Sequence, residues 1–209
     1  MGFLPLMSGG GSGFADKDAM EELGIFNRKK NYIWIKGRLL FPITIDGEIV
    51  ALAGRHIPRE REYKQPVRYI NSGRTELFHR NEVVYGLDVV DDVPTGNLFV
   101  VEGYADVWSL DAVDVPAVAI MSDRLTQSQS ETLTEFALKR ELMLTIAFDG
   151  DNGGMRGEDL AVATFLQNGV KAVSLGLPSG DVSSAVSETD LQASEKLYDH
   201  LNLLERFHA

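Results

Sequence analysis

From about residue 97 onward, short apolar runs alternate with segments whose apolar residues recur every three or four positions. Short continuous runs of aliphatic residues are typical of strands buried on both faces, and the three-to-four spacing is typical of helices with one buried side. This alternation predicts an α/β fold with a parallel sheet and helices on both faces. The predicted strands are residues 98–102, 116–121, 142–148 and 170–177, and the predicted helices are residues 104–112, 126–139, 157–168 and 188–205.

The chain before this region has the pattern of a β-hairpin. Residues 38–45 and 48–53 are apolar, β-branched runs joined by Asp46-Gly47, a dipeptide typical of two-residue hairpin turns. Pro42 has no N–H to donate, so we expect its strand to lie at a sheet edge or to be bulged. The hairpin indicates a smaller mixed α+β subdomain in this half of the chain.

Two further segments complete the N-terminal half. Residues 16–23 predict a short helix that ends at Gly24, a usual residue after a helix C-terminus. Residues 59–73 are polar and basic, which favours a loop.

These patterns suggest four parts. Residues 1–13 contain a Gly/Ser run typical of a flexible segment. Residues 14–93 form the smaller subdomain, 94–187 the domain with the parallel sheet, and 188–209 a C-terminal helix.

Composition excludes several classes of protein. The 209 residues include no cysteine, which rules out disulfides and cysteine-ligated zinc within this sequence. No apolar stretch has membrane-spanning length, and no signal peptide is evident. We therefore expect a cytoplasmic protein that does not associate with a membrane.

The net charge of −11 is unevenly distributed along the chain. Residues 27–80 hold twelve Lys/Arg and five Asp/Glu, a net charge of +7, whereas the rest holds eight and twenty-six, a net charge of −18. This asymmetry suggests two functional surfaces, one of them suited to an anionic partner. A solvated basic face without a partner is an equally good interpretation of the basic stretch alone.

Carboxylates lie at or just after the ends of three of the predicted strands. Glu102 is the last residue of the first strand, Asp149 and Asp151 come after the third, and Asp181 comes after the fourth. The carboxyl ends of parallel strands are where open α/β sheets bind ligands. Carboxylates gathered there repel one another unless a divalent cation lies among them, so the pattern points to magnesium-dependent phosphoryl chemistry. Each motif taken alone is more often a turn or a helix cap.

The two acidic segments together resemble a known domain. Residues 100–107 (Val-Val-Glu-Gly-Tyr-Ala-Asp-Val) and 148–154 (Phe-Asp-Gly-Asp-Asn-Gly-Gly) are similar to the two signatures of the TOPRIM domain of primases, topoisomerases and some nucleases. Residues 37–43, 53–55, 68–72, 77–80 and 84–87 resemble the small subdomain that precedes TOPRIM in bacterial DnaG-type primases. The motifs follow the family order from about residue 37 to 181.

This resemblance implies a primase-type nucleotidyltransferase, a DNA-directed RNA polymerase that makes short RNA primers for DNA replication. It implies Glu102, Asp149 and Asp151 as catalytic residues, and Mg²⁺ or Mn²⁺ held by Glu102, Asp149, Asp151 and Asp181. Glu102 would either assist proton removal or hold a metal ion. The implied partners are a single-stranded DNA template, nucleoside triphosphates, and a replicative helicase or a separate zinc-binding protein that recognises the template.

The resemblance also implies a binding surface for nucleotides and DNA. Its residues are Arg38, Arg55, Arg68, Asn71 and Arg80. Template and triphosphate are densely anionic, so a groove opposite a metal site needs fixed cations.

Two departures from the family pattern keep other functions open. Ser183 stands where a second acidic residue commonly follows the Asp181 position, and Ser122-Asp123 stands where a Gly-Thr pair is usual. One alternative is a TOPRIM-type metal-dependent nuclease. The other is a non-catalytic module of a replication complex that binds nucleotides or single-stranded nucleic acid.

Overall fold

The computed structural model describes residues 17–27, 32–33, 37–58, 67–90, 93 and 96–208. Backbone contacts divide the chain into two compact units. One unit comprises the residues up to Leu40 and Ala51–Phe78, and the other comprises Phe41–Val50 and everything from His79 onward. The predicted flexible segment 1–13 lies outside the described residues, and the four-part division made from the sequence remains a prediction.

The second unit is built on a four-stranded parallel sheet with the order β7-β6-β8-β9. The strands are β6 (Asn97–Val101), β7 (Ala117–Ala119), β8 (Met143–Ala147) and β9 (Ala172–Ser174). Every residue of the central strand β6 is buried, as its continuous apolar run predicts. The α/β architecture expected from the sequence is confirmed.

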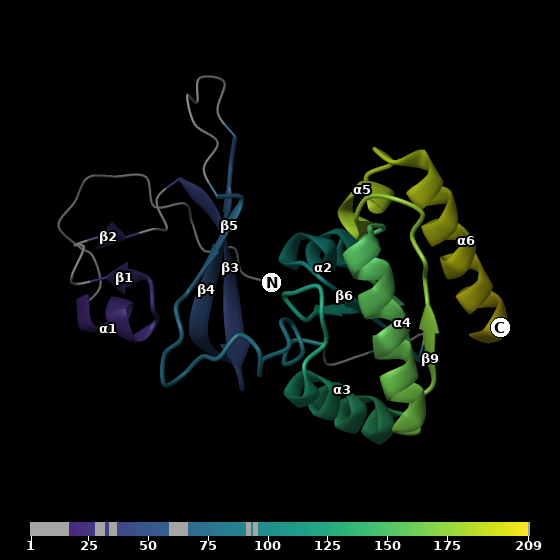
Figure 1. Cartoon of the computed structure of the whole chain (residues 1–209), viewed down its shortest axis with the longest axis horizontal. Helices are drawn as coiled ribbons and strands as arrows, with labels where there is room; N and C mark the ends of the chain where they lie inside the picture. Colours follow the sequence, from purple (N-terminus) through teal and green to yellow (C-terminus); the bar gives the residue numbers. More distant parts are fainter. Residues whose placement is uncertain are drawn as a thin grey trace. The chain divides into compact units, whose positions relative to one another are not determined.

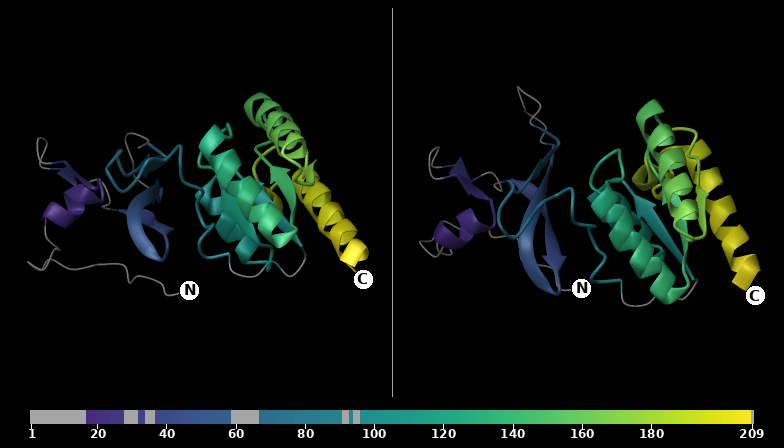
Figure 2. Two further views of the ribbon diagram at one scale, coloured as in Figure 1. Left: turned by 90° about the horizontal axis from the view of Figure 1, so that it is seen from below. Right: turned by 60° about the horizontal axis from the view of Figure 1, so that its bottom comes forward.

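In the part of the chain that the structure describes, helices α2 to α6 accompany this sheet (Figure 1). They are α2 (Tyr104–Asp111), α3 (Gln127–Arg140), α4 (Asn152–Gln167), α5 (Val182–Val186) and α6 (Leu191–His208). One large apolar core joins alternate residues of the strands, such as Val100 and Ile146, to Leu133 of α3 and Phe165 of α4. Accordingly α3 and α4 lie next to each other over one face of the sheet (Figure 2).

The other face of the sheet is in contact with α6. His200 of α6 lies edge-on to the ring of Phe99, with 5.9 Å between ring centroids, and its Nε2 is 3.0 Å from Oγ1 of Thr145. Phe99 and Thr145 are paired neighbours on β6 and β8. Because successive strand residues point to opposite faces, α6 covers the face that α3 and α4 leave open.

The first unit contains α1 (Lys17–Glu22), a short ladder of β1 (Phe26–Asn27) with β2 (Tyr32–Ile33), and part of an antiparallel sheet. That sheet has the order β3-β4-β5, formed by β3 (Arg38–Ile45), β4 (Glu48–His56) and β5 (Tyr69–Asn71). The boundary between the two units runs through β3 and β4.

Several local predictions are confirmed. Asp46 and Gly47 have φ angles of 53° and 82°, which is the backbone of a type I′ hairpin turn. Strand β3, which contains Pro42, lies at the edge of its sheet. Thr126 caps α3, since its side chain accepts a hydrogen bond from the N–H of Gln129. Gly24, with φ of 66°, follows α1.

Other local predictions were wrong, each for a physical reason. Strand β5 lies inside the segment predicted as a loop, because its pairing with β4 depends on a partner distant in sequence. Helix α4 begins at Asn152 and not at residue 157, because the Asp151 side chain caps its first turn. The glycines of that turn have low helix propensity, so the sequence pattern did not reveal it. Helix α5 was not predicted, and β9 keeps only three of the eight residues predicted as a strand.

Among the described residues, none of the helices combines the length and the apolar character needed to cross a membrane.

Candidate active site at the carboxyl edge of the parallel sheet

The site begins with a contact between the ends of the two central strands. Glu102 directly follows β6, and Asp149 comes two residues after the end of β8. The backbone N–H of Asp149 donates a 3.0 Å hydrogen bond to Oε1 of Glu102. This bond joins two acidic segments that are 47 residues apart in the sequence.

A second backbone contact connects the loops after β8 and β9. The N–H of Gly150 donates a 2.8 Å hydrogen bond to the carbonyl oxygen of Gly180. A Cβ atom on residue 150 would lie 2.5 Å from the backbone nitrogen of Ser179, so only glycine permits this approach. The contact places the Asp149–Asp151 loop beside the loop that leads into Asp181.

Asp151 and Asp181 hold the starts of two helices. Oδ1 of Asp151 accepts hydrogen bonds from the N–H groups of Gly153 and Gly154, both 2.8 Å long, at the start of α4. Oδ1 of Asp181 accepts from the N–H and the hydroxyl of Ser184, at 2.8 and 2.6 Å, in α5. In each case the hydrogen bonds to one carboxylate oxygen fix the side chain.

The carboxyl group of Glu102 carries a perturbed pKa. The pKa of Glu102 is raised from 4.5 to about 7: burial is the largest cause, the Asp149 N–H partly opposes it, and the negative charges of Asp149, Asp151 and Asp123 add to it. Glu102 is therefore in electrostatic contact with both aspartates of the second acidic motif. A carboxyl group with a pKa near neutrality exchanges protons readily at physiological pH.

Two acidic residues near the site were given no role from the sequence. Asp106 of α2 is 6% exposed and accepts hydrogen bonds from Ser183, which follows Asp181 by two positions. Asp123 lies in the loop after β7, and its negative charge raises the pKa of Glu102. The sequence did give one indication of a role for Asp106. It stands three residues after Gly103, the spacing at which an acidic side chain accepts a hydrogen bond from the backbone N–H at the N-cap of its own helix.

The donor set suits a hard divalent cation, since every candidate side chain offers carboxylate oxygens. Within the part of the chain that the structure describes, no three His, Asp or Glu side chains already converge as a group that could hold one ion. Mg²⁺ characteristically keeps several waters and binds through one or two carboxylates together with substrate phosphates. The residues present fit that kind of site, in which the phosphates complete the ligand set.

Four of the five predicted binding residues lie on or next to the β3-β4-β5 sheet of the first unit. The guanidinium groups of Arg55 and Arg68 lie 5.7 and 5.8 Å from the ring centroid of Tyr69. Asn71 pairs with Ala53 on β4. Arg38 donates through Nη1 to backbone carbonyls, 3.2 Å to Gly54 and 2.9 Å to Val67, so at least part of its guanidinium stabilises this sheet.

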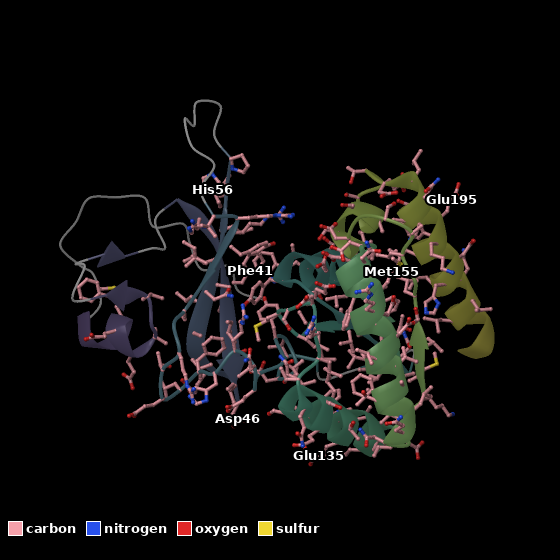
Figure 3. The ribbon with its side chains drawn as sticks, in the orientation of Figure 1. Phe41, Asp46, His56, Glu135, Met155 and Glu195 are labelled. Atoms are coloured by element: carbon pink, nitrogen blue, oxygen red, sulfur yellow. The ribbon has the colours of Figure 1, made fainter. Side chains whose placement is uncertain are left out.

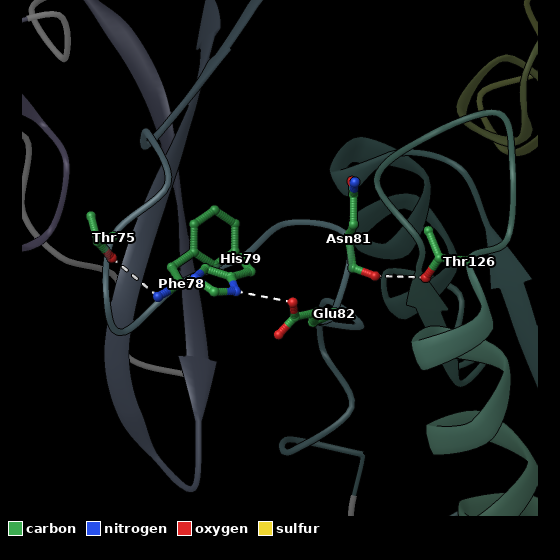
Figure 4. Close-up of polar contacts among 6 residues, drawn as sticks. All are labelled: Thr75, Phe78, His79, Asn81, Glu82 and Thr126. Atoms are coloured by element: carbon green, nitrogen blue, oxygen red, sulfur yellow. Dashed lines mark hydrogen bonds and ion pairs between the residues drawn. The ribbon is translucent and has the colours of Figure 1, made fainter.

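Arg80 lies instead in the second unit. The next residue, Asn81, is joined to the start of α3 (Figure 4). The hydroxyl of Thr126 donates a 2.6 Å hydrogen bond to the carbonyl of Asn81. The buried amide of Gln129 donates to the carbonyls of Val83 and Ile120, both at 2.9 Å. The Arg80 side chain itself is exposed.

The sequence matches two family models in succession. Residues 10–91 match the DNA primase catalytic core, N-terminal domain, and residues 99–186 match a Toprim-like domain. The fold and the acidic edge thus define a Toprim-like protein with a primase-type N-terminal domain. The chain belongs to the family of DnaG-type primase catalytic cores.

Individual relatives agree with this assignment. The DNA primase of Synechococcus elongatus is 29% identical over 175 residues, which is 78% of this chain and 24% of that protein. A DNA primase domain from Pseudomonas aeruginosa is 29% identical with a TM-score of 0.65, over 82% of this chain and 55% of that one. The DnaG primase catalytic domain bound to ssDNA is 25% identical with a TM-score of 0.68, over 88% and 58%. The chain spans about a quarter of the length of the curated relative.

Proposed function

We propose that this chain is a primase-type nucleotidyltransferase, which extends a short RNA primer on single-stranded DNA in a metal-dependent reaction. The 3′-hydroxyl of the primer attacks the α-phosphate of an incoming nucleoside triphosphate, a new P–O bond forms, and pyrophosphate leaves. The observation that carries the proposal is the contact of Glu102 with Asp149 at the carboxyl ends of the two central parallel strands. That edge is where sheets of this class bind their ligands.

The acidic residues have distinct roles in this proposal. Asp149, Asp151 and Asp181 would hold Mg²⁺ or Mn²⁺, which supplies stabilisation of charge on the attacking and leaving oxygens when bound. We assign Glu102 as the group that accepts the proton of the 3′-hydroxyl, since a carboxyl with a pKa of about 7 is suited to act as a base at neutral pH.

The basic residues would bind the anionic strands. The guanidinium groups of Arg55 and Arg68 lie 5.7 and 5.8 Å from the ring centroid of Tyr69, within the range of a cation–π interaction. Their N–H groups would bind phosphate oxygens. Asn71 and Arg80 offer an amide and an exposed guanidinium. We propose a single-stranded DNA template as the partner, in line with the ssDNA-bound primase domain that has the same fold. A replicative helicase and a zinc-binding template-recognition protein are further proposed partners.

The experiment is primer synthesis from labelled nucleoside triphosphates on single-stranded DNA, with Mg²⁺ or Mn²⁺. Glu102→Gln and Asp149→Asn should each reduce the yield by about a hundredfold or more, since each removes a charge at the reacting centre. The matched control is Glu135→Gln, an exposed position on α3 away from the site, which should retain activity (Figure 3). Equal activity of wild type and both site variants would contradict the assignment.

The same preparation distinguishes the alternatives. Cleavage of DNA with metal but without nucleotides, and no primer synthesis, would favour a nuclease. Binding of nucleotide and DNA that does not respond to divalent metal, with no turnover, would favour a non-catalytic module.

A further inference from the structure

A cluster of hydrogen bonds connects the segment that follows Glu102 with the segment that follows Asp181. We call Gly103, Asp106, Ser109 and Ser183 the α2–α5 hydrogen-bond cluster. Oδ2 of Asp106 accepts from the N–H of Gly103 at 3.2 Å, while its Oδ1 accepts from the N–H of Ser183 at 2.9 Å and from the hydroxyl of Ser183 at 2.8 Å. The hydroxyl of Ser109 donates to the Ser183 hydroxyl at 3.2 Å.

The positions of these contacts in the sequence give the cluster its importance. Gly103 is the residue after Glu102, and Ser183 is two residues after Asp181. One carboxylate, 6% exposed, therefore holds the backbone beside both acidic residues. Asp106 and Ser183 are 77 residues apart in the sequence.

The chemistry of residue 183 matters because an ionised carboxylate only accepts hydrogen bonds. A buried carboxylate must be supplied with donors or it is costly to maintain. Ser183 supplies two donors to one oxygen, and the Ser109 hydroxyl occupies an acceptor position on Ser183. An acidic residue at 183 would replace the hydroxyl donor with a like charge.

We propose that Asp106 and Ser183 are positioning residues that set the place of Asp181 relative to Glu102, and that Asp106 is not itself a metal ligand. Both oxygens of Asp106 accept hydrogen bonds from the protein, which leaves them poorly placed to bind an ion as well. Groups of this kind, which hold ligands in place through hydrogen bonds, commonly contribute 10- to 100-fold to metal affinity. The inference rests on the proposed function, because it assumes that Asp181 is a ligand.

The test measures Mn²⁺ binding to the full chain by electron paramagnetic resonance, with thermal unfolding recorded on the same samples. Ser183→Ala removes the hydroxyl and should weaken Mn²⁺ binding by about tenfold. Asp106→Asn puts an amide N–H₂ against one of the backbone donors and should weaken binding by at least as much. Ser183→Thr keeps the hydroxyl and should restore affinity to within about twofold of wild type. Ser187→Ala should bind as wild type does, because the exposed Ser187 hydroxyl donates to the backbone carbonyl of Ser183 and not to Asp106.

A purely structural role would lower the unfolding temperature of these variants but leave Mn²⁺ affinity unchanged, and that result overturns the proposal. Loss of affinity in Asp106→Asn with none in Ser183→Ala would also overturn it, because it would mark Asp106 as a direct ligand. Absence of saturable Mn²⁺ binding in wild type would instead contradict the proposed function. The hydrogen bonds between Asp106 and Ser183 are then tested by thermal unfolding alone. The double variant Asp106→Asn/Ser183→Ala should unfold at the temperature of the less stable single variant, and additive decreases in unfolding temperature would overturn the proposed link between the two residues.

Discussion

The backbone N–H of Asp149 donates a 3.0 Å hydrogen bond to Oε1 of Glu102, so the loop after β8 holds the side chain that follows β6 in place. The bond favours the ionised form of Glu102, yet burial and three neighbouring aspartates act in the opposite direction and prevail. Without a cation, this edge of the sheet therefore carries unfavourable electrostatic energy.

Glu102→Gln is expected to stabilise the metal-free protein at alkaline pH. The folded pKa of about 7 lies above the usual 4.5, so between these values the native state binds more protons than the unfolded state. The contribution of Glu102 to the free energy of unfolding is therefore fully present below about pH 4.5 and is lost as the pH rises through about 7. Gln cannot ionise but keeps an oxygen for the Asp149 N–H. After allowance for solvent screening, the variant should gain on the order of 1 kcal/mol at pH 8 and little at pH 4.5.

The measurement is urea denaturation of both proteins in the presence of a chelator at several pH values. Glu135→Gln on α3 controls for the loss of one negative charge and should show no comparable pH dependence. A difference between wild type and Glu102→Gln that does not grow from pH 5 to pH 8 would contradict the raised pKa.

Gly150→Ala is expected to destabilise the protein and disrupt the site. The new Cβ would lie 2.5 Å from the backbone nitrogen of Ser179, so one of the two loops has to move and the bond from Gly150 to Gly180 is lost. Backbone cannot yield as a flexible side chain does, and we expect a loss of about 2 kcal/mol in urea unfolding. Gly73→Ala, where a Cβ would meet nothing within 4 Å, is the matched control. Equal stability of the two variants would refute the claim that the loop contact requires glycine.

The acidic edge was predictable because it follows from local patterns and one topological rule. The buried runs before Glu102 and Asp149 identify β6 and β8, and parallel strands place their carboxyl ends at the same edge. The hairpin turn at Asp46-Gly47 was predictable for a similar reason, since its backbone conformation depends on two adjacent residues.

Features that depend on distant partners were not predictable in this way. The role of Asp106 depends on Ser183, and no local pattern relates the two residues. Strand β5 exists because β4 supplies its ladder, and its three residues are too few for a recognisable alternation. The early start of α4 was hidden by glycines that usually disfavour a helix.

His200 is expected to make the packing of α6 sensitive to acid. Burial, together with the charge of Lys196, lowers the pKa of His200 below its usual 6.5. Because the pKa of His200 is lower in the folded state, the unfolded state binds the proton more readily. The contribution of His200 to the free energy of unfolding is therefore fully present above about pH 6.5 and is lost as the pH falls through the folded pKa. The His200 resonance in an NMR titration should report this lower pKa, and His200→Gln should reduce the loss of stability between pH 7 and pH 5. A titration midpoint at or above 6.5 would contradict the prediction.

Arg55 and Arg68 are expected to contribute electrostatically to the binding of single-stranded DNA. If each contacts one phosphate, Arg→Gln should weaken binding and reduce the slope of log K against log salt by about 0.7. Arg55→Lys keeps the charge but loses the planar face over Tyr69, so it should retain the slope and lose part of the affinity. Anisotropy of a labelled oligonucleotide at several salt concentrations measures both the affinity and the slope.

Arg140→Gln is the control. Arg140 also lies over an aromatic ring, 3.9 Å from the centroid of Phe136 on α3, but it is outside the proposed binding surface. Slopes unchanged in Arg55→Gln and Arg68→Gln would show that neither residue contacts a phosphate.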